Sequence, residues 1–283
     1  MTKILHDTFV LELGKDTFVR GDVRVKGDAG RKPVLIIAHG FKGFKDWGMF
    51  PYAARRFAEE GFAVVTFNFS HNGVRERDFD ELEKFGRNTY SQEQKDLAAV
   101  LAAVLEDRLP EAERMDKEQV VLVGHSRGGG NSVLFAAEHS SISGVASWNG
   151  IANVNLFNNE FRETVMRDGV GYIINARTKQ EMPIQAVFFE DIDRNKKCFD
   201  IAARAAELRT PILFIQGMND AERLVEGFRR LRAAAPQHRF AEIQGTNHTF
   251  GTVHPFAGTT DALEQAMAMT IQFFKGIISN KGV

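Results

Sequence analysis

Short apolar runs alternate with longer segments of helical periodicity along most of the chain. Val34–Ala38 and Ala63–Asn68 are continuous apolar runs, and between them apolar residues recur at helical spacing from Phe50 to Ala58. A continuously apolar strand is typical of a parallel sheet that is covered on both faces, and parallel strands are usually joined by a helix. The pattern therefore predicts a β-α-β unit.

The same alternation continues toward the C-terminus. A helix is predicted from about Ser91, with Ser91 as N-cap and Gln94 in the third position after it, to Leu109 before Pro110. The pattern also predicts strands at Gln119–Val123, Gly144–Trp148, Pro211–Gln216 and Arg239–Ile243, and helices at Ser126–His139, Ala221–Ala235 and Thr259–Ile278. We therefore expect an α/β fold with a mostly parallel central sheet and helices on both faces.

The N-terminal segment has a different pattern. Apolar and polar residues alternate in Phe9–Leu13 and in Thr17–Lys26, on either side of Gly14-Lys15-Asp16. This alternation predicts an antiparallel hairpin with one solvent-exposed face. We expect the hairpin to form an edge of the sheet.

The alternation of strands and helices stops between Trp148 and Pro211. Residues 149–209 are rich in asparagine and weakly periodic, yet too apolar for a linker. We expect a helical cap insertion at 149–209 and a core domain formed by 1–148 and 210–283. The aromatic residues of the insertion either line an acyl or aryl pocket or form the core of the cap. They are Phe157, Phe161, Tyr172, Phe188 and Phe189.

Composition and charge narrow the function classes. The 283 residues are 43% hydrophobic and 26% charged, which excludes a disordered or low-complexity protein. With 36 Lys and Arg against 37 Asp and Glu, the net charge of −1 gives no electrostatic attraction to nucleic acid or anionic membranes. No apolar run approaches the ~20 residues that span a bilayer. We therefore predict neither a nucleic acid nor a membrane partner; nothing in the sequence bears on the oligomeric state.

Cysteine usage and targeting signals indicate the compartment. The single cysteine, Cys198, excludes an intramolecular disulfide framework and a Cys-only zinc site. The first thirteen residues are interrupted by charges and leave no secretory signal core. We expect a cytoplasmic protein. Neither metal-ligand spacing nor a phosphate-binding glycine loop stands out, so we expect no cofactor and no metal.

The strand that ends at Val123 leads directly into Gly124-His125-Ser126-Arg127-Gly128 and then into a predicted helix. This strand–turn–helix context is that of a nucleophile elbow. A serine on such a tight turn has strained backbone angles, and glycines two positions away on either side leave space for it. The pattern predicts Ser126 as a nucleophile, with the Arg127 N–H at the positive end of the helix facing a developing oxyanion. The alternative is a structural tight turn.

With this motif the chain resembles an α/β-hydrolase-fold serine hydrolase from Val34 to the C-terminus. The His39-Gly40-Phe41 loop and the size of the insertion look most like compact bacterial esterases of the dienelactone-hydrolase and cinnamoyl-esterase type. The resemblance implies that His39 and His125 belong to the oxyanion-loop and elbow motifs. It also implies an oxyanion hole formed by the N–H groups of Phe41 and Arg127.

A serine nucleophile needs a base whose pKa lies near neutrality, and histidine is the natural candidate. Among the eight histidines, His248 follows the last predicted strand and precedes the last helix, where the family places its base. We predict that His248 is this base. His254 is the rival candidate.

The third member of such a triad is a carboxylate that accepts the other imidazole N–H. Asp220 follows the predicted strand that ends at Gly217, and the order Ser126, Asp220, His248 is that of the family. The other interpretation of Asp220 is an N-cap of the following helix. Asp191 and Asp193, in the insertion, are alternative acids.

Three cationic residues lie close to the oxyanion loop or the elbow: Lys42, Lys45 and Arg127. They either attract an anionic substrate or are solvated surface charges.

These residues together predict a serine hydrolase that cleaves a small-molecule carboxylic ester through an acyl-enzyme. An aminopeptidase, thioesterase or acyltransferase can use the same triad. An aminopeptidase needs carboxylates to hold the substrate's amino terminus, for which the insertion offers Glu160, Glu163, Glu181 and Glu190. A third hypothesis is a non-catalytic ligand-binding protein of the same fold.

Overall fold

The computed structural model describes residues 3–279, and within that range the strands form one eight-stranded sheet and one two-stranded sheet. The order in the large sheet is β1-β2-β4-β3-β5-β6-β9-β10. Its strands are β1 (Ile4–Gly14), β2 (Thr17–Lys26), β3 (Lys32–Ala38), β4 (Ala63–Asn68), β5 (Met115–His125), β6 (Ile142–Trp148), β9 (Ile212–Gly217) and β10 (Arg239–Ile243). Strand β2 pairs antiparallel with β1 and β4, and all other neighbours are parallel. The predicted mostly parallel α/β fold is confirmed.

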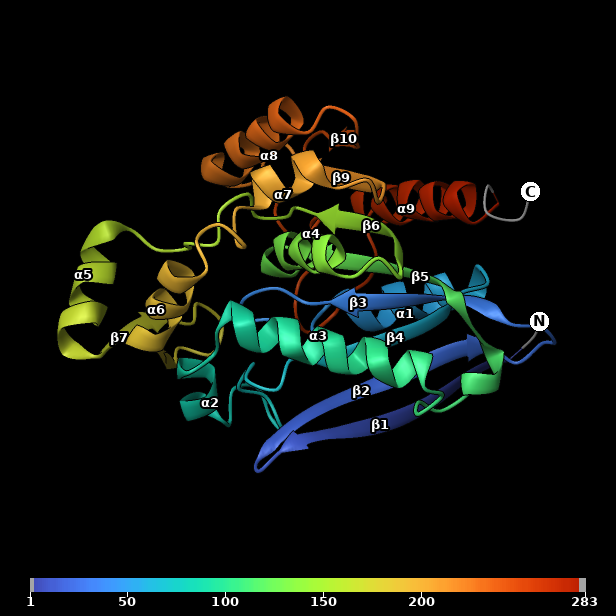
Figure 1. The fold of residues 1–283 in the computed structure, drawn as a ribbon, viewed down its shortest axis with the longest axis horizontal. Helices are drawn as coiled ribbons and strands as arrows, with labels where there is room; N and C mark the ends of the chain where they lie inside the picture. The colour runs from blue at the N-terminus through green and yellow to red at the C-terminus, as the bar shows by residue number, and fades with distance from the viewer. Residues whose placement is uncertain (1–2, 280–283) are drawn as a thin grey trace.

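Helices cover both faces of this sheet (Figure 1). They are α1 (Phe50–Glu59), α2 (Leu82–Gly86), α3 (Tyr90–Leu105), α4 (Arg127–Glu138), α5 (Asn159–Asp168), α6 (Ala186–Arg194), α7 (Ile201–Glu207), α8 (Glu222–Ala234) and α9 (Asp261–Ser279). In β3, Val34 and Ile36 join the core cluster under α3, α4 and α8, whereas Leu35 and Ile37 join the cluster under α1 and α9. Burial on both faces explains why the central strands are continuously apolar.

The N-terminal hairpin forms the edge of the sheet, as expected, but β1 is longer than predicted. It begins at Ile4 rather than Phe9, with Leu5 opposite Val25 of β2. The polar residues at positions 6–8 are exposed and interrupt the apolar alternation. The pairing with β2 therefore extends the strand where the local pattern gives no signal.

Helix α3 begins and ends earlier than predicted. Its N-cap is Thr89, whose Oγ1 accepts the N–H of Gln92 at 3.1 Å, so the prediction of Ser91 as N-cap is wrong. The Ser91 hydroxyl instead donates to Asp191 at 2.5 Å. The helix ends at Leu105 rather than Leu109, shortly before Asp107, whose φ of 56° is incompatible with a right-handed helix.

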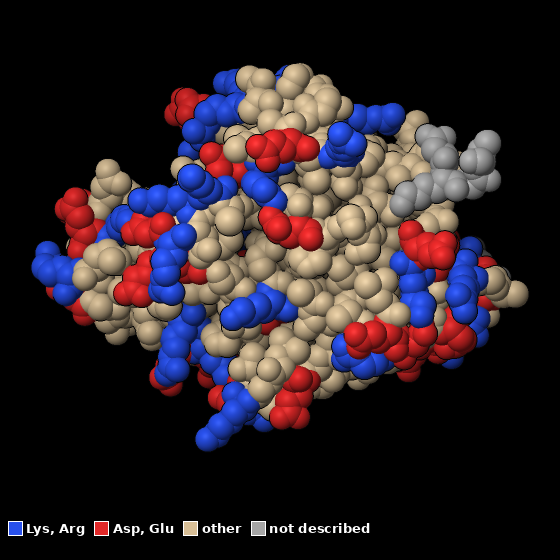
Figure 2. Space-filling model, viewed as in Figure 1, with Lys and Arg blue, Asp and Glu red and all other residues tan. Residues whose placement is uncertain are grey.

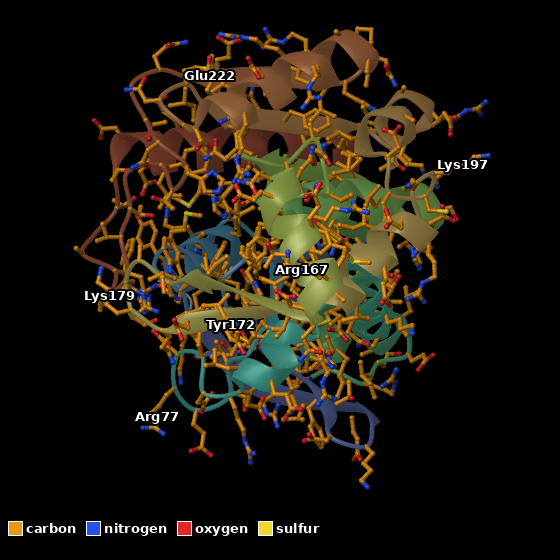
Figure 3. All side chains as sticks on the ribbon, turned by 90° about the vertical axis from the view of Figure 1, so that its left-hand side faces the viewer. Arg77, Arg167, Tyr172, Lys179, Lys197 and Glu222 are labelled. Atoms are coloured by element: carbon orange, nitrogen blue, oxygen red, sulfur yellow. The ribbon has the colours of Figure 1, made fainter. Side chains whose placement is uncertain are left out.

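The segment 149–209 contains helices, as expected, and in addition a strand pair that the sequence did not predict. Besides α5, α6 and α7 it contains the antiparallel hairpin of β7 (Val170–Ile174) and β8 (Glu181–Gln185). Met182 and Ile184 are buried and alternate with less buried neighbours, which is a strand period within a short stretch. Helices α5 and α6 and the β7 strand lie at the left of Figure 1, whereas α7 lies beside α8; the hairpin faces the viewer in Figure 3, where Tyr172 on β7 and Lys179 at its tip are labelled.

The surface carries both signs of charge. Figure 2 shows lysine and arginine interspersed with aspartate and glutamate over the face in view. Within residues 3–279, no helix combines the length and the apolar character needed to cross a membrane.

Candidate active site

The turn between β5 and α4 has the geometry of the predicted elbow. Ser126 has φ 57° and ψ −120°, a left-handed conformation that costs a residue with a side chain ~1–3 kcal/mol. Its N–H donates to the Trp148 carbonyl at 2.9 Å, which helps to hold the turn. A Cβ on Gly124 would lie 2.2 Å from the Gly128 carbonyl oxygen, so a larger residue does not fit there.

The structure brings the three predicted triad residues together. His248 Nε2 lies 2.8 Å from Ser126 Oγ, and His248 Nδ1 lies 2.7 Å from Asp220 Oδ2. Asp220 follows β9 and His248 follows β10, so both residues come from loops at the carboxyl ends of parallel strands. An ionised carboxylate only accepts hydrogen bonds, so Nδ1 carries the proton and Nε2 is free to accept the serine proton.

Asp220 is held in an environment that favours its ionised form. Burial alone would raise the pKa of this carboxyl, but the hydrogen bond and the electrostatic interaction with His248 lower it. The Ala221 N–H at 2.7 Å and Gln216 Nε2 at 3.1 Å also donate to the carboxylate, and the net pKa lies below the ordinary value. The N-cap position of α8 is occupied by Ala221, so Asp220 is not its N-cap residue.

The rival candidates have other partners. His254 Nδ1 accepts the Gly48 N–H at 2.9 Å, and its ring stacks on Trp47. Asp191 accepts the Ser91 N–H at 3.0 Å in the first turn of α3, while Asp193 pairs with Arg162 at 2.6 Å. These contacts give His254 and the two aspartates structural roles away from the Ser126–His248 pair.

The loop after β3 approaches the nucleophile closely. A Cβ on Gly40 would lie 2.8 Å from Ser126 Cβ and 2.9 Å from the His125 carbonyl oxygen, so only glycine allows this approach. In the described part of the chain, the Phe41 N–H has no main-chain acceptor. Arg127 is the first residue of α4, where an N–H has no partner inside the helix. Both N–H groups therefore lack a main-chain partner within the described residues, as an oxyanion-hole donor requires.

His39 supports the oxyanion loop. Its Nδ1 lies 3.0 Å from the Gly40 carbonyl oxygen, and its Nε2 accepts the Phe69 N–H at 3.3 Å. Burial lowers the pKa of His39 to about 4. The ring is therefore neutral at physiological pH, with its proton on Nδ1, and acts as a link between two main-chain segments.

The three cations near the site differ in role. The Arg127 guanidinium is buried, pairs with Glu93 at 3.0 Å and lies 4.2 Å from the centroid of the Tyr90 ring. It is therefore neither a solvated surface charge nor exposed to an incoming substrate. Lys45 pairs with Asp22 at 3.0 Å. Lys42, by contrast, is half-buried beside Ser126, and burial lowers the pKa of its ammonium group.

A cavity of about 260 Å³ opens beside Ser126. It is lined by aromatic rings, two cations and the tip of the hairpin in the insertion: Phe41, Trp47, Phe50, Lys42, Arg177, Asn175 and Ala176, besides Gly40, Gly43, His125, Ser126, His248 and Thr249. Within the described chain, none of the five insertion aromatics contributes to this lining. Phe188 and Phe189 are instead buried in the main core, and Tyr172 is 58% exposed.

Two features of the site were missed from the sequence. Gln216 is fully buried and donates to Asp220, and Asn175–Arg177 reach the cavity from the insertion. Gln216 gave a usable signal, because it is a polar residue at the carboxyl end of an otherwise apolar strand. Asn175–Arg177 gave none, since their position depends on the hairpin. Across residues 3–279 no three His, Cys, Asp or Glu side chains converge as metal ligands.

Comparisons with known proteins agree with this fold. The chain matches the model of the dienelactone hydrolase family over residues 20–278. It is similar to the α/β hydrolase GrgF from Penicillium sp. sh18, with a TM-score of 0.73, 15% identity, and 97% and 99% of the two chains covered. Est1E from Butyrivibrio proteoclasticus gives a TM-score of 0.68 at 14% identity, with 96% and 99% covered. The dienelactone hydrolase from Anabaena variabilis gives a TM-score of 0.61 at 14% identity, with 96% of this chain and 98% of that chain covered.

One curated relative is similar over a shorter stretch. It is the 31.7 kDa protein encoded in the traX-finO intergenic region of Escherichia coli. The two sequences are 28% identical over 117 residues, which is 41% of this chain and 37% of that protein.

Proposed function

The chain belongs to the dienelactone hydrolase family, and on that premise we propose that it cleaves small-molecule carboxylic esters with Ser126 as nucleophile, His248 as base and Asp220 as orienting acid. Family membership supports hydrolysis of esters. The observation that carries the serine mechanism is the hydrogen-bonded series from Ser126 Oγ through the His248 ring to Asp220, at 2.8 and 2.7 Å.

The proposed reaction has two stages. Ser126 Oγ attacks the ester carbonyl while His248 Nε2 takes its proton, and the N–H groups of Phe41 and Arg127 hold the resulting oxyanion. The tetrahedral intermediate then expels the alcohol, which leaves with the proton from His248, and the acyl group stays on Ser126. In the second stage His248 takes a proton from water as the water attacks the acyl carbonyl. The bond between the acyl carbon and Ser126 Oγ then breaks, the acid leaves, and His248 returns the proton to Ser126.

We propose that residues 149–209 act as a cap over a core domain formed by 1–148 and 210–283. The contribution of Asn175–Arg177 to the cavity supports this division, because part of the pocket wall then comes from the cap. The cavity of about 260 Å³ lies at the small end of ligand pockets, which supports a compact acyl or alcohol group. The aromatic lining of the cavity favours an apolar acyl or alcohol group.

Two observations favour the esterase over its rivals. The four glutamates considered for an aminopeptidase (Glu160, Glu163, Glu181 and Glu190) are all exposed, and within the described residues none lines the cavity. The presence of nucleophile, base and acid in bonding geometry argues against a purely ligand-binding protein. A thioesterase or acyltransferase remains the alternative on the same triad.

We further propose a cytoplasmic location and a small-molecule substrate rather than nucleic acid or membrane lipid. The free, exposed thiol of Cys198 supports a reducing compartment. The net charge of −1 supports a partner that is not a polyanion.

A substrate panel tests this proposal. We expect the protein to hydrolyse short-chain and aryl esters with higher kcat/KM than acyl thioesters or amino-acid amides, because the cavity offers no carboxylate to bind an amino terminus. Initial rates should be measured at one pH, with each substrate's spontaneous hydrolysis subtracted. Preference for the amides would replace the esterase by a peptidase, and preference for thioesters would replace it by a thioesterase.

A further inference from the structure

We propose that His125 and Asn149 are positioning residues that together hold the main chain of His248 and thereby set the distance from its ring to Ser126. The inference rests on the proposed function, since it concerns the base of that reaction. It adds two residues that do not take part in the proton transfers themselves.

The carbonyl of His248 is the point at which both residues bind. It lies 2.8 Å from His125 Nε2 and 2.8 Å from Asn149 Nδ2. A carbonyl oxygen has two lone pairs, so these two donors satisfy it completely. His125 is 7% exposed and Asn149 is fully buried, so water cannot readily replace either donor.

Asn149 also links this carbonyl to the strand that leads to Asp220. Its main-chain N–H donates to the Ile215 carbonyl at 2.8 Å, and its Oδ1 accepts the Gly217 N–H at 2.7 Å. The residue has a φ of 45°, a left-handed conformation that asparagine tolerates better than most residues. One side chain therefore fixes the end of β9 and the His248 loop relative to each other.

His125 contributes its bond as a neutral ring. Because a carbonyl oxygen only accepts, His125 Nε2 must carry the ring proton. Burial lowers the pKa of His125 to about 3, so the ring stays uncharged at neutral pH. Its centroid lies 4.9 Å from that of His248. A neutral neighbour at this distance donates the bond without repelling the imidazolium that forms on His248.

The rest of the His248 loop is bonded both to itself and to neighbouring segments: the Asn219 N–H donates to the Thr246 carbonyl at 2.9 Å, and Thr260 Oγ1 donates to the Phe250 carbonyl at 2.5 Å. Asn247 Oδ1 accepts the N–H groups of Thr249 at 3.1 Å and Gly251 at 2.8 Å, which makes a compact turn. The His248 carbonyl anchors this turn to β5 and β6. If the anchor is lost, the main chain at His248 can shift between these flanking contacts and displace Nε2 from Ser126. A displacement of about 1 Å costs on the order of 10²-fold in rate.

Variants at His125 separate the hydrogen bond from the bulk of the side chain. In His125→Gln an amide N–H replaces the imidazole N–H, whereas His125→Leu removes the donor and keeps an apolar group of similar size. We expect kcat for an activated ester to fall about 10²-fold in His125→Leu and to stay within about fivefold of the unmodified protein in His125→Gln, with little change in KM. Asn149→Asp, which keeps the acceptor for Gly217 but loses the Nδ2 donor, should resemble His125→Leu.

His238→Leu is the matched control. His238 Nε2 also lies 2.8 Å from a carbonyl oxygen, that of Ala205, and the residue is 9% exposed, but it lies outside the site. Its loss should lower the thermal unfolding temperature by about as much as His125→Leu, with turnover unchanged. Equal kcat in His125→Leu and His238→Leu would overturn the positioning role, and so would a loss in His125→Gln as large as in His125→Leu.

A separate readout keeps this inference distinct from the proposed function. If a fluorophosphonate labels Ser126 in all variants but at unchanged rates, the positioning role fails and the proposed function stands. If Ser126 is not labelled in the unmodified protein, the proposed function itself fails. Slower labelling of His125→Leu and Asn149→Asp, together with normal labelling rates in His125→Gln and His238→Leu, supports both the positioning role and the proposed function.

Discussion

Ser126→Ala is expected to lower the turnover of an activated ester by on the order of 10⁶-fold, as when the nucleophile of a serine protease is removed. The Ser126 hydroxyl is the group that forms the acyl bond. Among the described residues it is the hydroxyl that lies within hydrogen-bond distance of His248 Nε2, at 2.8 Å. The fold should remain intact, because alanine keeps the elbow backbone and removes one oxygen. Steady-state kinetics with circular dichroism of the variant give both quantities.

Ser141→Ala serves as the control, since Ser141 lies in the turn between α4 and β6 and outside the site. Its turnover should equal that of the unmodified protein. A Ser126→Ala protein that keeps most of its activity would mean that another group is the nucleophile, and the tight turn at Ser126 would then be structural only.

Asp220→Asn is expected to lower kcat by on the order of 10⁴-fold while leaving the protein folded. The depressed pKa of Asp220 keeps this carboxylate ionised at neutral pH, where it accepts the Nδ1 proton of His248. An asparagine amide can donate to Nδ1 instead, which leaves the proton on Nε2 and prevents that atom from accepting one from Ser126. Turnover at neutral pH and the thermal unfolding temperature should be measured together.

Asp193→Asn is the paired control, because Asp193 is one of the two alternative acids, with Asp191, and pairs with Arg162 in the insertion. It should retain full turnover. Unimpaired Asp220→Asn together with an inactive Asp193→Asn would show that the acid enters from the insertion, and that Asp220 merely accepts the N–H that begins the next helix.

The core of the fold was predictable because burial on both faces leaves a direct trace in the sequence. β3, β4 and β5 contain the apolar runs that such burial requires, and the elbow glycines follow from the space around Ser126. These features depend on residues close to one another in the chain. The candidate acid and base could be located because the loop after β9 contains Asp220 and the loop after β10 contains His248 with its rival His254.

Two of the mispredicted elements differ from expectation, one because of a contact between distant residues and one because its strand period is obscured. The start of α3 is one case: Ser91 is a reasonable N-cap by itself, but its hydroxyl bonds to Asp191, one hundred residues away, and Thr89 takes the cap. The hairpin β7–β8 is another, since exposed Tyr172 and Ile174 obscure the strand period.

Contacts between residues far apart in the sequence also limit what could be predicted of the site. The role inferred for Asn149 depends on the meeting of β6, β9 and the His248 loop, which no local pattern encodes. The only local sign is a polar residue directly after a buried strand. Lys42 and Arg177 likewise reach the same cavity from segments more than one hundred residues apart.

The most direct test of the central claim is covalent labelling with a fluorophosphonate, followed by intact mass measurement and peptide mapping. We expect a single adduct, on Ser126, whose formation is abolished by Ser126→Ala and strongly slowed by Asp220→Asn. An adduct on any other residue while Ser126 remains unmodified, or no adduct on a folded protein, would contradict that claim.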